Sequence, residues 1–477
     1  MLFSSLIFLF VFLPIVLGIY FIVFKKSMLA KNMLLLFASL FFYAWGEPKF
    51  VLVMILSIIV NYIFGRVIDQ KRIGRGYDRL YLCLSIIFNI GILFIFKYLN
   101  FTISNINNVF GDIIPQTNIV LPIGISFFTF QAMSYVIDVY RGTVKVQKNL
   151  LYLALYISFF PQLIAGPIVR YSDIEEQISN RSVTFDDFSE GVRRFLIGIS
   201  KKVILANNFA LIADEAFSNV GEGNLSISFA WLGSIAYTLQ IFFDFSAYSD
   251  MAIGLGRMFG FRFLENFNYP YISSSVSEFW RRWHISLGMW FRDYVYIPLG
   301  GSHVENKLLL VRNLFIVWSL TGIWHGANWT FILWGLLYFI LLTFEKLTRI
   351  PKIFKHKFSK LIYGVFTFLC VNTGWVIFRA DNISQAFNYL KAMAGVGNVE
   401  LSNSLFNQYL GEYWVFILIG IIYSTSIFYY LRNKIRLNKK MNKIAEYTAM
   451  IVYNILFIIS VSYLVMGAYN PFIYFNF

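Results

Sequence analysis

Long apolar runs constrain the fold of this chain more than any other feature of its sequence. Residues 2–24, 80–96 and 361–376 are almost wholly apolar, and such runs approach the ~20 residues that an α-helix needs to cross a bilayer. Charged residues make up only 14% of the chain, whereas soluble domains carry roughly a quarter. We therefore predict an all-α, polytopic membrane protein with about ten to twelve transmembrane helices, embedded in the lipid bilayer.

The basic residues lie in short segments between the apolar runs. A net charge of +15 would otherwise suggest nucleic-acid binding, but this distribution is the positive-inside pattern of membrane proteins. We expect no nucleic-acid partner, and we expect the basic clusters to face the cytoplasm and the N-terminus to lie outside. The clusters are Lys25, Lys26 and Lys31; Arg66, Lys71, Arg72, Arg75 and Arg79; Arg141, Lys145 and Lys148; and Arg170, Arg181, Arg193, Arg194, Lys201 and Lys202.

Two segments do not fit a simple bundle. Residues 150–168 lie between two basic clusters and are interrupted by Pro161 and by Gly166-Pro167, so we predict a re-entrant element covered by protein. Residues 185–210 have a basic face at helical spacing, which predicts an interfacial helix. The single membrane domain, residues 1–477, would then comprise N-terminal helices (1–148), a core with re-entrant elements (149–345) and C-terminal helices (346–477).

The ends and the cysteines of the chain suggest no separate module. Residues 1–24 lack a basic start and a small-residue cleavage site, so we expect this first segment to be retained and not cleaved as a signal peptide. Cys83 and Cys370 both lie within apolar runs. We expect buried thiols there, without a disulfide framework or a metal site. Residues 379–413 are polar and should form an outer loop.

His325 is the most informative of the four histidines. It lies at the turn of an apolar hairpin spanning about residues 313–343, whose arms of about fifteen residues would reach only ~22 Å. The turn should therefore stop inside the bilayer, where ionisable residues are functional-site hypotheses by default. Imidazole can accept a proton from a hydroxyl near neutral pH. The alternative is a neutral histidine hydrogen-bonded between helices, whereas His303 and His356 lie in polar turns.

His284 lies in a segment rich in arginine and tryptophan, residues 277–301. The members of this group are Trp280, Arg281, Arg282, Trp283, Trp290 and Arg292. One interpretation is a site for an anionic, partly apolar donor whose phosphates pair with arginine. The other is a belt that anchors a horizontal helix at the membrane interface.

Asp244 and Asp250 lie on a long apolar helix predicted over residues 229–256. Six residues correspond to ~600° of helical rotation, so the two carboxylates should lie on different faces and cannot form an acid/base pair. We expect a structural role for each, as a helix-pairing hydrogen bonder or as a counter-ion to Arg281 or Arg292. Gly254, Gly256 and Gly260 miss the dinucleotide-binding spacing and indicate close helix packing.

Several motifs together resemble the membrane-bound O-acyltransferase superfamily, in the branch of the alginate O-acetyltransferase membrane subunit. The motifs are FYAWGEP (42–48), LPIGISF (121–127), FDFSAYSD (243–250), ENFNYPY (265–271), the Arg-Trp-His block around His284, WHGANW (324–329), GWVIFR (374–379) and the terminal FIYFNF (472–477). The resemblance covers nearly the whole chain. It departs from the family after Gly300-Gly301, where relatives often carry a short basic run.

This resemblance implies a fold and a set of site residues. The family fold is a ring of helices around a thinned centre, where a cytoplasmic tunnel and an outer funnel meet. His325 would be the active-site histidine and His284 the second catalytic position. We assign the remaining candidates to substrate binding: Arg281, Arg282, Trp283, Trp324, Asn328, Asp244 and Arg292.

The resemblance also implies a reaction. An acyl thioester donor, expected to be acetyl-CoA used as a substrate with no bound cofactor or metal, would supply an acetyl group from the cytoplasm for O-acetylation of an extracytoplasmic cell-wall or exopolysaccharide. An esterase-like acetyltransferase partner would modify the polysaccharide, and the protein would reside in the bacterial plasma membrane. The alternatives are D-alanyl transfer for teichoic acid modification and a transporter or channel, although inverted repeats are not visible in the sequence.

Overall fold

The computed structural model describes residues 1–477 except 73–76, 222–224, 355, 398 and 474–477. Arg75 of the second basic cluster and the last four residues of the C-terminal motif therefore lie outside the described residues. Within the described part, the secondary structure is helical and contains no strand. Its α-helices fall into two compact units, Met1–Phe195 with Ser249–Leu264, and Leu196–Tyr248 with Glu265–Phe477.

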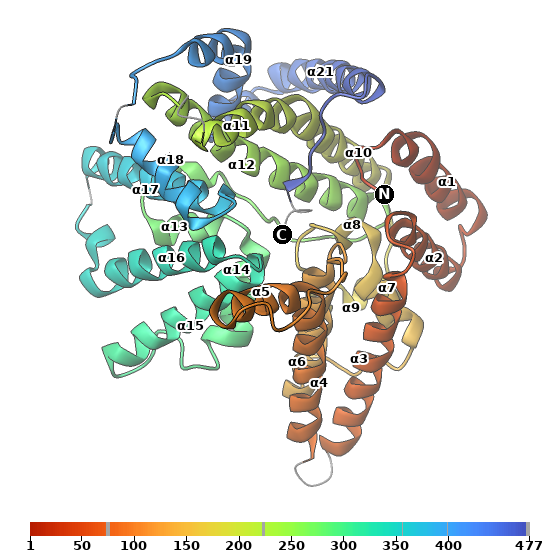
Figure 1. Cartoon of the computed structure of the whole chain (residues 1–477). Helices are drawn as coiled ribbons and strands as arrows, with labels where there is room; N and C mark the ends of the chain where they lie inside the picture. The colour runs from red at the N-terminus through yellow and green to blue at the C-terminus, as the bar shows by residue number, and fades with distance from the viewer. Residues whose placement is uncertain (73–76, 222–224, 355, 398, 474–477) are drawn as a thin grey trace. The chain divides into compact units, whose positions relative to one another are not determined.

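The first unit contains nine of the α-helices (Figure 1). They are α1 (Leu13–Gly18), α2 (Met28–Gly46), α3 (Val51–Arg72), α4 (Asp78–Leu93), α5 (Leu99–Phe110), α6 (Ile125–Arg141), α7 (Leu150–Ser158), α8 (Phe160–Leu163) and α9 (Tyr171–Ser179). Two further helices, α10 (Phe185–Ser200) and α12 (Ile227–Met258), run from one unit into the other.

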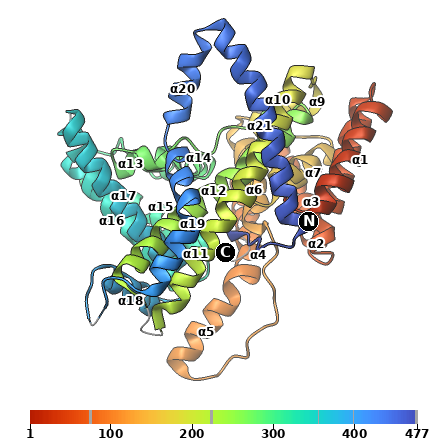
Figure 2. The ribbon, with the colours of Figure 1, turned by 90° about the horizontal axis from the view of Figure 1, so that it is seen from above.

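The second unit contains the remaining α-helices and both candidate histidines. They are α11 (Asn207–Ser218), α13 (Val276–Arg282), α14 (Ile285–Phe291), α15 (Lys307–His325), α16 (Trp329–Thr348), α17 (Lys357–Arg379), α18 (Ile383–Met393), α19 (Ser404–Tyr423), α20 (Ile427–Arg436) and α21 (Lys439–Val465). Figure 2 shows α20 joining α19 to α21. Short π-helical segments extend several helices, including Lys201–Ala206 and Arg292–Tyr296.

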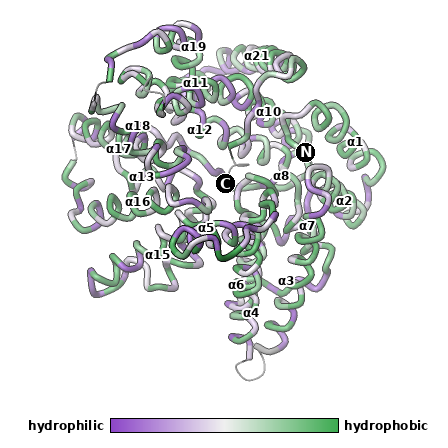
Figure 3. Tube along the Cα trace, in the orientation of Figure 1, coloured by the Kyte–Doolittle hydropathy of each residue, from purple (hydrophilic) through white to green (hydrophobic). Residues whose placement is uncertain are grey.

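Nine helices in the described residues are long and apolar enough to cross a membrane. Figure 3 shows hydrophobic residues predominating along α1, α3 and α16. The polytopic all-helical class is thus confirmed, although nine is fewer than the ten to twelve crossings predicted. One reason is that the first apolar run contributes only a shorter helical segment, Phe8–Val23.

The sequence Gly46-Glu47-Pro48 interrupts an apolar stretch and predicts a turn between two helices, and a turn lies there in the structure. α2 ends at Gly46 and α3 begins at Val51, and the Glu47 carboxylate in the turn accepts a hydrogen bond of 2.8 Å from the backbone N–H of Ile123. Asn61 of α3 and Asn89 of α4 exchange two amide hydrogen bonds of 2.8 and 3.1 Å. Such pairing satisfies polar groups between helices that are otherwise apolar.

Residues 150–168 form two short helices, α7 and α8, with a break at Phe159 and not a continuous span. Residues 153–169 of this stretch are all buried, which agrees with a non-spanning element that protein must cover. Residues 185–210 belong to one long helical stretch, Phe185–Ser218, that is long and apolar enough to cross a membrane. The interfacial position expected for residues 185–210 stays a prediction. Of the basic residues in this stretch, Lys202 is buried, and Arg193, Arg194 and Lys201 are half-buried.

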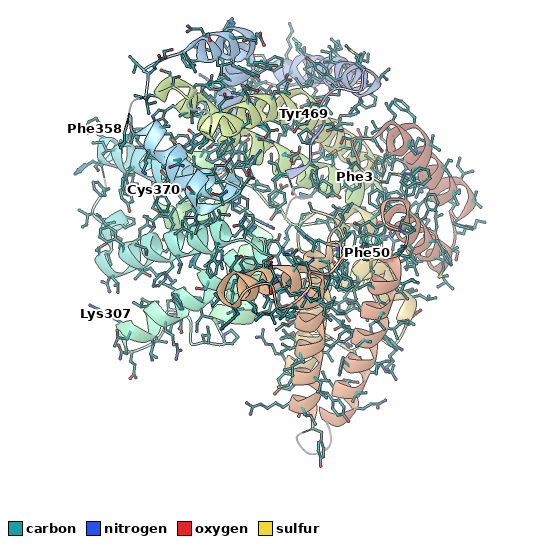
Figure 4. The ribbon with its side chains drawn as sticks, in the orientation of Figure 1. Phe3, Phe50, Lys307, Phe358, Cys370 and Tyr469 are labelled. Atoms are coloured by element: carbon teal, nitrogen blue, oxygen red, sulfur yellow. The ribbon has the colours of Figure 1, made fainter. Side chains whose placement is uncertain are left out.

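Three smaller predictions need correction. The cysteines are not buried, since Cys83 is exposed and Cys370, on α17 (Figure 4), is half-buried; apolar helix faces that would meet lipid carry them. The segment 379–413 is largely helical, because it contains α18 and the start of α19.

The hairpin arms α15 and α16 contain 19 and 20 residues, or about 28–30 Å of helix, because both helices extend into charged residues at their far ends. Their length alone therefore does not place the turn inside a bilayer.

The hairpin α15–α16 packs closely through two glycines. A methyl group at Gly335 would lie 2.5 Å from the backbone oxygen of Trp318, and one at Gly322 would lie 2.5 Å from that of Phe331. Glycine permits such backbone approach between membrane helices. The hairpin that carries His325 therefore depends on these two positions.

We predict that Gly335→Ala destabilises this hairpin. Overpacking of this kind costs about 1–3 kcal/mol, which should exceed the gain of up to ~1 kcal/mol in helix propensity. Thermal unfolding in detergent should show a lower Tm. Gly411→Ala on α19 is the matched control, because a methyl group there meets no atom within 4 Å. An equal or higher Tm for Gly335→Ala would contradict the close packing.

Candidate active site

The two candidate histidines contact the same indole ring. His325 is the last residue of α15 and is 6% exposed, and His284 precedes α14 and is 2% exposed. The ring centre of Trp324 lies 5.0 Å from that of His325 and 6.2 Å from that of His284. The structure thus brings together three residues that are separated by up to 41 positions in the sequence.

Aromatic rings surround the His325 imidazole. Besides Trp324, the rings of Trp334 and Phe378 lie 4.9 and 5.2 Å away, each at about 80° to the imidazole plane. These rings come from α16 and α17, so three helices meet at the histidine. Gly326 follows His325, and a methyl group there would overlap the Phe331 ring. Burial of this kind excludes water and strengthens electrostatic interactions within the site.

Asn266 fixes the position and tautomer of His284. The residue adopts a left-handed backbone conformation with φ of 45°, and its Nδ1 lies 3.3 Å from Asn266 Oδ1. The same oxygen accepts hydrogen bonds from the backbone N–H and the hydroxyl of Ser286, at 3.0 and 2.9 Å. Because Asn266 Oδ1 is an acceptor throughout, it favours the proton on Nδ1 and the lone pair on Nε2.

His284 is neutral in this setting. Burial lowers the pKa of its imidazole to about 3, since charging an enclosed ring is costly. A neutral imidazole with its lone pair on Nε2 can accept a proton from a hydroxyl. Sequence reasoning missed Asn266 as a site residue, although it lies within the ENFNYPY motif.

A cavity of about 490 Å³ extends from His284 between α13, α14, α15 and the end of α16. Its walls are mostly apolar, with three cationic side chains. The lining residues that matter here are Trp280, Arg281, His284, Arg292, Tyr296, Trp318, Thr321 and Lys346. Arg281 and Arg292 lie with His284 at this one cavity. Sequence reasoning missed Tyr296, although it lies within the same segment 277–301, and Lys346, which lies 62 positions beyond His284.

The three cations differ in their surroundings. Arg292 forms an ion pair of 2.7 Å with the neighbouring Asp293, and Lys346 donates a hydrogen bond of 2.8 Å to the hydroxyl of Tyr296. Arg281 is exposed. A solvated guanidinium at the cavity wall can form bidentate hydrogen bonds with a phosphate.

His325 is not among the residues that line this cavity. Its neighbour Trp334 packs on two tryptophans of the cavity wall, with ring centres 5.5 Å from Trp280 and 6.2 Å from Trp318. The cavity and His325 are therefore connected through edge-to-face indole rings, which include Trp334, and also through Trp324.

Five of the seven predicted binding residues are not among those that line the cavity: Arg282, Trp283, Trp324, Asn328 and Asp244. Arg282 pairs with Glu278 at 2.8 Å, and Trp283 packs on Trp375 with ring centres 4.8 Å apart. Asn328 caps α16 by accepting from the backbone N–H of Thr330, at 3.1 Å. Their contacts support the elements that carry the histidines.

Asp244 joins two helices, which is one of the two structural roles expected of it, and it does not act as a counter-ion to Arg281 or Arg292. Its carboxylate lies 2.6 Å from Lys202 Nζ, and both side chains are at most 5% exposed. Asp250 pairs with Arg194 at 2.7 Å. Lys202 was expected to face the cytoplasm with its basic cluster, and no sequence pattern indicated Asp244 as its partner.

The Lys202–Asp244 pair also holds the C-terminal segment. The backbone N–H of Ile473 donates a hydrogen bond of 3.0 Å to Asp244, and Lys202 Nζ donates to the backbone oxygen of Pro471. Tyr469, labelled in Figure 4, donates to Asp214 of α11 at 2.7 Å. Among the described residues, no group of three His, Cys, Asp or Glu side chains could hold a metal ion.

A buried histidine pair beside a cationic apolar cavity suits acyl transfer in a polytopic membrane protein. Residues 144–378 match the MBOAT, membrane-bound O-acyltransferase family. Together with the relatives below, this match shows that the chain belongs to the membrane-bound O-acyltransferase family and is a membrane O-acyltransferase.

The chain is 41% identical to the probable alginate O-acetylase AlgI of Pseudomonas putida, over the full length of both proteins. It is 38% identical to the peptidoglycan O-acetyltransferase of Helicobacter pylori, covering 84% of this chain and 81% of that protein. Identity with the teichoic acid D-alanyltransferase of Bacillus subtilis is 31%, over 55% of this chain and 70% of that protein. The predicted family and branch are thus confirmed, and an enzyme is favoured over a transporter.

Proposed function

We propose that this membrane O-acyltransferase takes an acetyl group from acetyl-CoA at the cytoplasmic face of a bacterial plasma membrane and delivers it for O-acetylation of an extracytoplasmic polysaccharide. The observation that carries the proposal is the pair of buried histidines that both contact Trp324, one of which, His284, lines the cationic cavity. Two of the relatives described above are named as O-acetyltransferases or O-acetylases of polysaccharides.

The cavity suits the donor in charge and shape. An acyl-CoA combines phosphates with a long, mostly apolar pantetheine arm, and the cavity combines three cations with tryptophan and leucine walls. Arginine pairs well with phosphates. In this proposal Arg281 contacts the phosphates at the exposed side of the cavity, and the thioester points toward His284.

The reaction needs a proton acceptor and then a proton donor. The acceptor hydroxyl oxygen forms a bond to the acetyl carbonyl carbon, the carbon–sulfur bond breaks, and the hydroxyl proton passes through a histidine to the leaving thiolate. In this proposal His325 takes the proton, and His284 forms the wall of the cavity beside the thioester. A covalent alternative has the same overall balance. His325 first attacks the acetyl carbonyl carbon and displaces the thiolate, and the acceptor hydroxyl then takes the acetyl group from His325.

The polysaccharide itself is expected to be handled by another protein. The described residues outside the apolar helices form short helices and connections, such as α18 and α20. We therefore propose an extracytoplasmic, esterase-like acetyltransferase as the partner that places the acetyl group on the polysaccharide.

Purified protein in liposomes tests this proposal against D-alanyl transfer. Labelled acetyl-CoA and a D-alanyl thioester of a carrier protein are supplied separately, and the release of free thiol is measured. We expect thiol release from acetyl-CoA above that of protein-free liposomes, and none from the D-alanyl carrier. Release from the D-alanyl carrier alone would support the teichoic acid reaction instead.

We predict that Arg281→Gln weakens donor binding. Losing one charge-assisted pair with a phosphate costs about 1.5–3 kcal/mol, so KM for acetyl-CoA should rise by about 10- to 100-fold, with kcat little changed. Arg432→Gln on α20 is a control, since this arginine is exposed and lies in another helix. An unchanged KM for Arg281→Gln would remove Arg281 from the donor site.

A further inference from the structure

Glu345 is a buried carboxylate that no part of the proposed reaction uses. It lies near the end of α16 and is 4% exposed. Its neighbour Lys346 and its hydrogen-bond partner Ser277 line the donor cavity, but Glu345 itself is not among the lining residues. A buried carboxylate is costly unless hydrogen bonds compensate it, so its contacts reveal what it does.

Four hydrogen bonds converge on this carboxylate. The backbone N–H groups of Val276 and Ser277 donate to it at 2.7 and 2.8 Å. The Ser277 hydroxyl donates at 2.6 Å, and the Tyr363 hydroxyl of α17 donates at 3.0 Å. Glu345 therefore joins α16 to the first turn of α13 and to α17.

The first turn of α13 is completed from two sides. Ser275 accepts a hydrogen bond of 3.1 Å from the backbone N–H of Glu278. Glu345 accepts hydrogen bonds from the backbone N–H groups of Val276 and Ser277, which precede Glu278. The start of a helix leaves such donors without partners inside the helix, and its dipole favours negative charge there. Both the position and the direction of α13 thus depend on Glu345.

The three elements joined by Glu345 carry the walls of the active site. α13 carries Trp280 and Arg281, which line the cavity, and it leads directly into His284. α16 carries Trp334, which contacts His325, and α17 carries Phe378, which also contacts His325.

We propose that Glu345 is a positioning residue that holds α13 so that Trp280 and Arg281 form the donor cavity beside His284. This inference rests on the proposed function, because it assigns Glu345 to the donor side of that reaction. Glu345 does not touch the substrate, and it acts through α13.

The test compares Glu345→Gln with the native chain in acetyl-CoA-dependent thiol release. Glutamine keeps the size but presents an NH2 group to donors that need an acceptor. KM for acetyl-CoA should rise at least about tenfold, while kcat falls less than threefold. Tyr363→Phe and Ser277→Ala each remove one hydroxyl donor and leave both backbone bonds, so each should raise KM by a smaller factor, about twofold to fivefold.

The controls separate the possible outcomes. Glu412→Gln on α19 changes an exposed carboxylate and should leave KM unchanged, and Glu345→Asp should restore part of the affinity that Glu345→Gln loses. If Glu345→Gln does not fold, the two hydroxyl variants carry the test. If the folded variants keep the native KM, or if they lower kcat without changing KM, the positioning role of Glu345 is overturned. Absence of thiol release by the native chain would instead overturn the proposed function.

Discussion

Replacing His325 with alanine should lower acetyl-CoA-dependent thiol release at least ~100-fold, because general acid–base catalysis contributes about 10²–10⁴-fold. The imidazole lies at the meeting point of α15, α16 and α17, enclosed by Trp324, Trp334 and Phe378. KM for acetyl-CoA should change little, since His325 is not among the residues that line the donor cavity. Steady-state kinetics in liposomes measures both quantities.

Two further histidines provide matched controls for this variant. His303 and His356 are exposed, and replacing either with alanine should leave the rate unchanged. His325→Gln preserves more of the packing than alanine and should be equally inactive, which separates lost chemistry from a lost ring contact. Near-native rates for both His325 variants would make His325 a structural residue of the helix interface.

Replacing Lys202 with methionine should destabilise the protein by about 3–5 kcal/mol, because it leaves the Asp244 carboxylate buried without its counter-charge. The side chains of this pair are 5% and 2% exposed, so solvent screens the interaction little. Denaturant unfolding in mixed micelles should show this loss of stability. The variant should also loosen the C-terminal segment, which Lys202 and Asp244 bind through Pro471 and Ile473.

The double variant Lys202→Met with Asp244→Asn is the control for charge. Removing both charges removes the uncompensated carboxylate, so the double variant should be more stable than Lys202→Met alone. Carboxypeptidase digestion of the folded protein should be faster in Lys202→Met than in the native chain. If Lys202→Met were as stable as the native chain, the pair would not hold the helices and the C-terminal segment together.

The sequence alone predicted the features that depend on local patterns. Gly46-Glu47-Pro48 interrupts an apolar run and marks the turn between α2 and α3, and the WHGANW motif marks the turn of the α15–α16 hairpin. The different faces of Asp244 and Asp250 follow from helical spacing, and each carboxylate has its own cationic partner. Helical periodicity and turn residues depend only on residues that are close together in the chain, so they can be recognised in a single sequence.

The features that the sequence did not predict depend on contacts between distant segments. Lys202 was expected only to face the cytoplasm with its basic cluster, and nothing near it in sequence indicates Asp244. The cavity combines α13 and α14 with Lys346, and Asn266 reaches His284 across 18 positions. Such partners become visible only when the packing of the helices is known.

The proposed reaction takes acetyl-CoA at the cytoplasmic face of the membrane and delivers the acetyl group at the other face. An assay that supplies acetyl-CoA to one face at a time distinguishes this reaction from one that is confined to a single face. Inverted membrane vesicles that contain the protein, its extracytoplasmic partner and the enclosed polysaccharide would receive labelled acetyl-CoA on the outside, which is the cytoplasmic face. We predict ester-linked label on the enclosed polysaccharide with the native chain and at least ~100-fold less with His325→Ala. Equal labelling by the two chains, or labelling only when acetyl-CoA is placed inside the vesicles, would contradict the account.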